Sequence, residues 1–161
     1  MRIIMKNTLV IDTSDKVARF GLFQGDKLAD HLEWEAHREL SKTFYSKLDE
    51  LLGRSKLSYQ NLGSIIVVRG PGSFTGLRIG IVIVNAFAYA LGVETAGVIQ
   101  KEKMSSHSVI PARQRSGKHP VGIQKMSLEE IYSAGKKDLK KGQTLEPFYG
   151  RETNITTKKK K

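Results

Sequence analysis

Short apolar runs separated by polar turn residues dominate the first part of the chain. Residues 8–11, 17–23 and 28–34 are rich in apolar and β-branched side chains and predict three strands. Gly25-Asp26 is a tight-turn pair between the second and third runs, and polar residues join the first to the second. Successive strands joined this closely form hairpins, so we expect an antiparallel meander.

A helical period replaces this pattern over residues 37–52. The apolar positions Leu40, Phe44, Leu48, Leu51 and Leu52 recur at the spacing of one helix face. This stripe predicts an amphipathic helix that packs on a neighbouring element, and Gly53 is expected to end it.

Residues 64–92 form the longest apolar stretch and predict a strand, a glycine loop and a helix. The strand is expected over residues 65–68 and stops at Arg69, where Gly70-Pro71-Gly72 forms a turn. Ser73 or Thr75 is the expected N-cap of the helix. Residues 79–91 are apolar nearly all the way round, which is typical of a helix covered on more than one side by this chain or by a partner. A charge-free run of this length is too short to span a membrane, and residues 93–98 predict a further strand.

The glycine loop opens a helix, and a helix N-terminus can in principle bind an anion. A Walker A loop requires Gly-Lys-Ser/Thr, but Gly76 is followed by Leu77 and Arg78. A nucleophile elbow around Ser73 requires glycines where Pro71 and Thr75 stand. We therefore expect neither a P-loop nor a serine hydrolase.

Two interpretations of the loop glycines stay open. Gly70, Gly72 and Gly76 form a variant of the dinucleotide fingerprint, with Glu94 at a suitable distance for a ribose, although Pro71 interrupts the turn. The other interpretation is close packing, because Gly72, Gly76 and Gly80 are four residues apart and those on the helix share one face.

Composition narrows the class of protein. A chain of 161 residues with 39% hydrophobic side chains can form one domain with a real core. It has no cysteine, which excludes disulfides and thiolate chemistry, and its first residues lack a signal-peptide pattern. We therefore expect a cytoplasmic protein.

The net charge of +11 is concentrated in the last third of the chain. Residues 1–100 carry twelve basic and ten acidic side chains, whereas residues 101–161 carry fifteen and six. Such a tail raises affinity for RNA in a salt-dependent way. Only Tyr132, Phe148 and Tyr149 accompany these charges, which argues against a base-stacking platform.

The predicted order of elements is that of a ribonuclease-H-like or actin-like half domain, an α/β fold with a mixed sheet and helices. Residues 9–14 (LVIDTS) and 69–80 (RGPGSFTGLRIG) carry a family resemblance, and residues 147–156 (PFYGRETNIT) resemble the same family's C-terminal signature. The chain resembles the TsaB (YeaZ) family of bacterial tRNA-modification proteins.

This resemblance implies an actin-like ATPase fold that has lost catalysis and serves as a scaffold for making threonylcarbamoyladenosine on tRNA. It implies a heterodimer with a TsaD-type catalytic subunit, a TsaE-type ATPase in a larger assembly, and a homodimer as a further option. The pairing surface would lie on the helix over residues 37–52 and the helix after the glycine loop. The residues expected there are Leu40, Phe44, Leu48, Leu51, Gly76, Ile79, Gly80, Ile83, Val84 and Phe87. The same side chains could instead be core against the sheet.

One departure from the family is large. Too few residues separate Val98 from Gln143 for a complete second actin-like lobe, so we expect that lobe to be largely missing. We divide the chain into an actin-like domain (1–100), an abbreviated C-terminal region (101–157) and a basic tail (158–161). Residues 127–141 predict a helix that begins with a capping box formed by Ser127 and Glu130.

Few residues support catalysis. Asp12, Thr13 and Ser14 resemble a phosphate-binding loop, which we interpret as vestigial, although an Asx turn would also explain them. No histidine pair has metal-ligand spacing, and we expect no cofactor and no metal. The alternative is a ribonuclease-H-like nuclease or a nucleotide-binding enzyme that uses Asp12, with Asp15 nearby, and the glycine loop. Our hypothesis is a scaffold without catalytic activity, whose contact with tRNA is indirect or through the basic tail.

Overall fold

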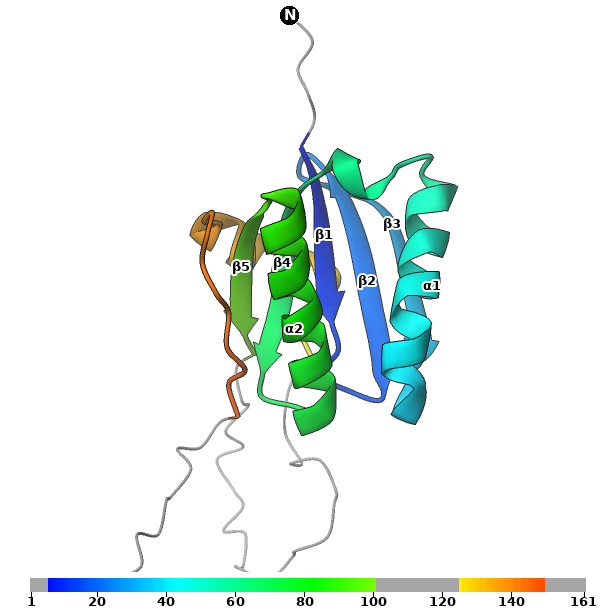
Figure 1. The fold of residues 1–161 in the computed structure, drawn as a ribbon, viewed down its shortest axis with the longest axis vertical. Coiled ribbons are helices and arrows are strands. Elements are labelled where there is room, and N and C mark those ends of the chain that lie inside the picture. The colour runs from blue at the N-terminus through cyan, green and yellow to red at the C-terminus, as the bar shows by residue number, and fades with distance from the viewer. Residues whose placement is uncertain (1–5, 101–124, 150–161) are drawn as a thin grey trace, which may run out of the picture.

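A five-stranded mixed sheet with helices on both faces organises the protein (Figure 1). The computed structural model describes residues 6–100 and 125–149. The strands are β1 (Asn7–Asp12), β2 (Val17–Gln24), β3 (Lys27–Glu35), β4 (Leu62–Gly70) and β5 (Glu94–Ile99). The helices are α1 (Leu40–Arg54), α2 (Phe74–Leu91) and α3 (Leu128–Gly135), with short 3₁₀ turns at His37–Glu39, Tyr59–Asn61 and Lys136–Asp138.

The strand order is β3-β2-β1-β4-β5. β1, β2 and β3 form the predicted antiparallel meander, whereas β4 lies parallel to both β1 and β5. Ile11 at the centre of the sheet lies beside Phe20 of β2 and Val67 of β4. The predicted strands and their mixed pairing are confirmed.

Each face of the sheet has its own core, because successive side chains of a strand point to opposite sides. α1 and α2 cover the face that carries Leu9 and Ile11, and Phe44 of α1 is completely buried there. α3 covers the other face, which carries Val10, and Ile131 of α3 is completely buried against it. Figure 1 shows α1 and α2 in front of the sheet and α3 behind it.

Two of the predicted helix ends are wrong. α1 continues through Gly53 to Arg54, and the stop is supplied by Lys56, which adopts a φ of 54° and donates its N–H to the carbonyl of Gly53 at 3.0 Å. The helix predicted over 127–141 ends earlier, because Lys140 pairs with Thr95 at the edge of β5. The predicted starts are confirmed: Ser73 caps α2, and Ser127 and Glu130 form the capping box of α3.

The segment from Leu139 to Tyr149, which we call the C-terminal arm, runs along β5 and α2 (Figure 1). The side-chain amide of Asn85 in α2 binds the backbone of the arm: it donates to the carbonyl of Leu145 and accepts from the N–H of Leu145, both at 3.0 Å. The predicted tail at 158–161, and the family signature beyond Tyr149, lie outside the described residues.

Candidate functional site

The turn that follows β1 uses its polar groups internally. One carboxylate oxygen of Asp12 accepts hydrogen bonds from the N–H and the hydroxyl of Ser14, which is an Asx turn. The other accepts from Nε of Arg19 at 3.1 Å and from Nη2 of the same guanidinium. Asp12 is fully buried, so its carboxylate is neutralised inside the protein rather than offered to a phosphate or a metal ion.

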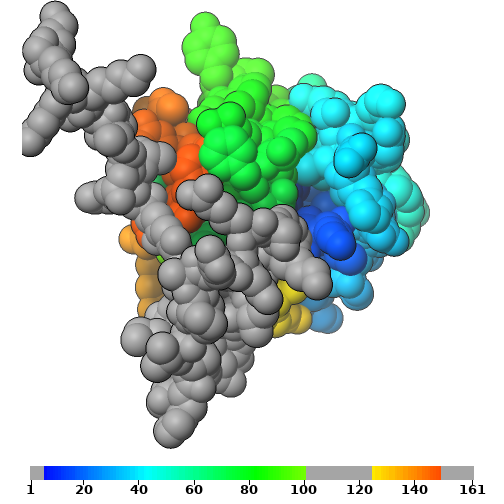
Figure 2. Space-filling model, turned by 90° about the horizontal axis from the view of Figure 1, so that it is seen from below, coloured from blue at the N-terminus to red at the C-terminus, as the bar shows by residue number. Residues whose placement is uncertain are grey.

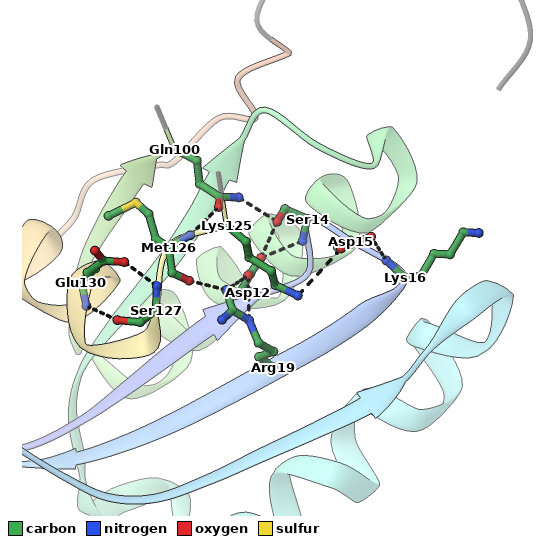
Figure 3. Close-up of polar contacts among 10 residues, drawn as sticks. All are labelled: Asp12, Ser14, Asp15, Lys16, Arg19, Gln100, Lys125, Met126, Ser127 and Glu130. Atoms are coloured by element: carbon green, nitrogen blue, oxygen red, sulfur yellow. Dashed lines mark hydrogen bonds and ion pairs between the residues drawn. The ribbon is translucent and has the colours of Figure 1, made fainter. Parts of the chain in front are cut away.

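This ion pair extends into a buried polar network that joins distant parts of the chain (Figure 3). Arg19 donates to the carbonyl of Met126 at 2.8 Å. Gln100, the residue after β5, donates to the hydroxyl of Ser14 at 2.9 Å and accepts from the N–H of Met126 at 3.3 Å. Asp12 and Arg19 are direct cross-strand partners, so the predicted hairpin between them already carried the signal for this pair, which sequence analysis missed.

The glycine loop packs against the same turn. Ser73 donates its N–H to the carbonyl of Ser14 at 2.7 Å, and the hydroxyl of Thr13 donates to the carbonyl of Gly76 at 2.7 Å. A Cβ at Gly72 would overlap the backbone of Ser14, and one at Gly76 would overlap the backbone of Thr13. Close packing therefore explains these glycines.

The dinucleotide interpretation is wrong for Glu94. The loop follows the carboxyl end of β4, whereas Glu94 begins the parallel strand β5 and so lies at the opposite end of the sheet. There it forms an ion pair with Lys6. Within residues 6–100 and 125–149, no group of three His, Cys, Asp or Glu side chains could hold a metal ion.

A pocket of about 290 Å³ opens beside this turn, between the starts of α1 and α2. Lys16, His37 and Arg38 line it together with the acidic Asp15 and with Thr75 of α2. His37 is already paired with Glu35 at 2.8 Å. The lining thus mixes both signs of charge and gives no strong preference for an anion.

Most residues predicted for the pairing surface lie inside the chain's own core. The side chains of Leu40, Phe44, Leu48, Leu51, Ile83 and Val84 are no more than 8% exposed, and Gly76 and Gly80 are buried. Ile79 and Phe87 are half-buried. The buried apolar side chains of this set belong to the core over the sheet, and Gly76 and Gly80 pack on Thr13, so pairing through α1 and α2 must use the other sides of these helices.

The outer sides of these two helices expose large apolar side chains that sequence analysis did not single out. Val82 is 66% exposed and Tyr89 is 94% exposed on α2, and Tyr45 is 48% exposed on α1. Val82, Ala86 and Tyr89 follow Ile79 at helical spacing, and Tyr45 reaches this stripe through Phe87, with 6.2 Å between the ring centroids. In the sequence, the signal for these exposed side chains was that α2 is apolar on nearly all of its sides.

The length and composition of α2 would also suffice for a membrane span, contrary to the length argument from the sequence, with 33% of the helix buried. Core helices pass the same test, and Leu77 and Val84 of α2 are fully buried against the sheet.

Comparison with known proteins shows which family the chain belongs to. The family described as TsaD, tRNA N6-adenosine threonylcarbamoyltransferase, matches residues 34–123, more than half of the chain. The chain belongs to this family. Its curated relatives include TsaB, the tRNA threonylcarbamoyladenosine biosynthesis protein, from Bacillus subtilis, with 27% identity over 99 residues. TsaB from Haemophilus influenzae is 34% identical over 82 residues.

A solved structure agrees with the TsaB relatives. YeaZ from Pseudomonas aeruginosa superposes with a TM-score of 0.56 at 26% identity, covering 60% of this chain and 45% of that one. The TsaB (YeaZ) resemblance and the actin-like, ribonuclease-H-like fold class are thereby confirmed. The matches cover 62% and 50% of this chain but 43% and 34% of the B. subtilis and H. influenzae TsaB proteins, so the chain spans less than half the length of these relatives.

Proposed function

We propose that this TsaB-type chain is a non-catalytic partner subunit in the formation of threonylcarbamoyladenosine on tRNA. It pairs with a TsaD-type catalytic subunit in the cytoplasm, and a TsaE-type ATPase joins the assembly. Relatives named as tRNA threonylcarbamoyladenosine biosynthesis proteins support the pathway. The observation that carries the pairing is the exposed apolar stripe on α2.

We define the helix-layer surface as this stripe of α2 together with Tyr45 of α1, which contacts α2 through Phe87; its five residues are Ile79, Val82, Ala86, Tyr89 and Tyr45. Contiguous exposed apolar patches on soluble proteins mark interaction sites. Covering them releases about 25 cal/mol for each Å² of apolar area. A helical layer on the partner would cover this surface, and a second copy of this chain would cover it in the partner's absence.

The absence of catalysis is supported by the state of Asp12. A ribonuclease-H-like nuclease needs clustered carboxylates that are free to hold metal ions. Here the carboxylate of Asp12 is buried and paired with Arg19, and Ser14 donates to it twice. The groups that an enzyme would present to substrate instead stabilise the fold.

The experiment is co-purification with the TsaD-type subunit from the same cell, followed by light scattering. Val82→Glu should abolish a one-to-one pair without lowering the melting temperature, because Val82 is 66% exposed in the isolated chain. Ala134→Glu makes the matched change at an exposed position of α3, on the other face of the sheet, and should pair normally. Wild-type pairing by Val82→Glu would contradict the helix-layer surface.

Buried positions do not test the surface. Leu48 and Val84 are fully buried, so Leu48→Glu or Val84→Glu should unfold the chain and would report on stability alone. Hydrolysis of RNA is the second readout: Mg²⁺-dependent hydrolysis by the wild type that Asp12→Asn loses at the wild-type melting temperature would favour the nuclease alternative.

A further inference from the structure

A cluster of aromatic and arginine side chains forms at the N-terminal end of α2. Phe74 and Arg78 come from α2, Phe148 and Tyr149 from the C-terminal arm, and Arg69 from the end of β4; we call these five residues the arginine–aromatic patch. Figure 2 shows the end of the molecule where α2 (green) and the arm (orange) lie together. Sequence analysis counted only the aromatic residues of the last third, and the fold adds Phe74 to them.

The patch is tightly organised. The rings of Phe74 and Tyr149 lie 4.6 Å apart, and the guanidinium carbon of Arg78 lies 3.8 Å from the centre of the Phe74 ring. Nε of Arg78 also donates to the Tyr149 hydroxyl at 2.9 Å. The guanidinium is therefore held in place by one of its five N–H donors and by cation–π contact.

The two arginines of the patch differ in their partners from the cations of the fold that form ion pairs. Arg54 pairs with Asp30, Lys47 with Glu50 and Lys136 with Asp26, so carboxylates balance those charges. Arg78 instead donates to a hydroxyl, and Arg69 donates to the carbonyl of Glu146 at 2.6 Å. These partners are neutral, and within the part of the chain that the structure describes neither Arg69 nor Arg78 forms an ion pair with a carboxylate.

The aromatic side chains of the patch remain accessible. Phe74 is 51% exposed and Phe148 is 40% exposed. Beyond Tyr149 the sequence carries Arg151 and the four terminal lysines, with Glu152 as its one acidic residue. Exposed rings beside unbalanced cations are the combination that binds a single nucleic-acid strand, because bases stack on the rings and phosphates pair with the cations. An apolar protein surface would gain nothing from the charges.

We infer that the arginine–aromatic patch binds a single-stranded segment of RNA, with a base stacked on the Phe74–Tyr149 pair and phosphates near Arg78 and Arg69. The inference extends the proposed function. That the RNA is tRNA rests on the proposed function. The patch and the helix-layer surface are neighbours on α2, where Arg78 and Val82 are four residues apart, so the variants Phe74→Ala and Val82→Glu are needed to separate their roles.

The test is fluorescence anisotropy of the full chain with a labelled single-stranded oligoribonucleotide, titrated at several salt concentrations. Phe74→Ala should weaken binding about fivefold or more with an unchanged salt slope, because it removes stacking and no charge. Arg78→Gln should reduce the slope of log affinity against log salt by about 0.7. Lys42→Gln is the matched control, since it removes an exposed cation that Glu39 already balances.

Four outcomes test whether the arginine–aromatic patch binds RNA. Loss of affinity in Phe74→Ala and Arg78→Gln beyond that in Lys42→Gln, at wild-type melting temperature, supports the patch. Affinities equal to the control overturn it, as does loss of TsaD pairing by Phe74→Ala with RNA binding intact, which would make the patch a protein contact. A chain ending at Tyr149 that shows no difference between wild type and Phe74→Ala also overturns it, because the tail alone would then bind. Failure of the proposed function is separate, since it is measured by the pairing of Val82→Glu.

Discussion

Gly76 lies where the first turn of α2 meets the backbone of Thr13, and no side chain fits between them. Gly76→Ala should therefore destabilise the protein by about 1–3 kcal/mol, the usual cost of overpacking. Gly53→Ala is the matched control in another helix, where nothing lies within 4 Å of the added methyl group, and should stabilise by about 0.5–1 kcal/mol. Urea unfolding of both variants checks the prediction, and shifts of the same sign would contradict the packing explanation.

The loop glycines and the predicted pairing residues show what a sequence can and cannot predict about the site. The spacing of Gly72, Gly76 and Gly80 gave close packing as one of two interpretations, but the packing partner, the Thr13–Ser14 turn, is a long-range contact that no local pattern encodes. The pairing residues show a related limit. A hydrophobic stripe such as the one through Leu48 marks the side of a helix that faces its own core, so a partner surface must be sought on the remaining sides.

Among the elements, α3 is attached to the hairpin turn between β2 and β3. Tyr132 stacks on Phe23 with 4.1 Å between ring centroids, and its hydroxyl donates to the carbonyl of Gly25 at 2.9 Å and to Asp26 at 2.8 Å. Lys136 pairs with Asp26 at 3.0 Å. This hydrogen bond from Lys136, followed by that from Tyr132, lowers the pKa of the Asp26 carboxyl.

The Tyr132 hydroxyl makes the free energy of unfolding depend on pH. Burial, followed by the hydrogen bond to Asp26, raises the pKa of Tyr132 to about 12 from 10.0. Because the folded pKa is the higher one, this stabilisation is fully present below pH 10 and is lost as the pH rises toward 12. Tyr132→Phe should cost about 1 kcal/mol at neutral pH. The difference from wild type should narrow at pH 11, as measured by urea unfolding, and a constant difference would contradict the hydrogen-bond explanation.

Element by element, the sequence predicted the strands and the starts of α2 and α3 well, because turns and caps are local. The ends of helices were harder. α1 passes Gly53 because the residue that leaves the helix is Lys56, and α3 stops short because Lys140 is recruited by the edge of β5. Tertiary contacts decide both ends.

At the scale of the whole molecule, the sheet needs elements from both ends of the sequence. α3 and Leu139 cover the face that carries Val10, Ile66 and Val98, all of which are buried. A chain ending at Gln100 should therefore be insoluble or unfolded, whereas a chain ending at Tyr149 should retain the wild-type circular dichroism spectrum and a cooperative thermal transition. A soluble, cooperatively folded chain ending at Gln100 would show that α3 is dispensable.

The bond between Gln100 and Met126 has a consequence for how the chain can change in length. The described chain therefore leaves the sheet and returns to it at one point, and the general cost of joining two such points with a flexible linker is the entropy of loop closure. That cost rises by only about 0.6 kcal/mol for each doubling of a flexible loop. The sheet, the helix-layer surface and the arginine–aromatic patch are all built from residues on either side of this point, so each is defined without the residues between Gln100 and Met126.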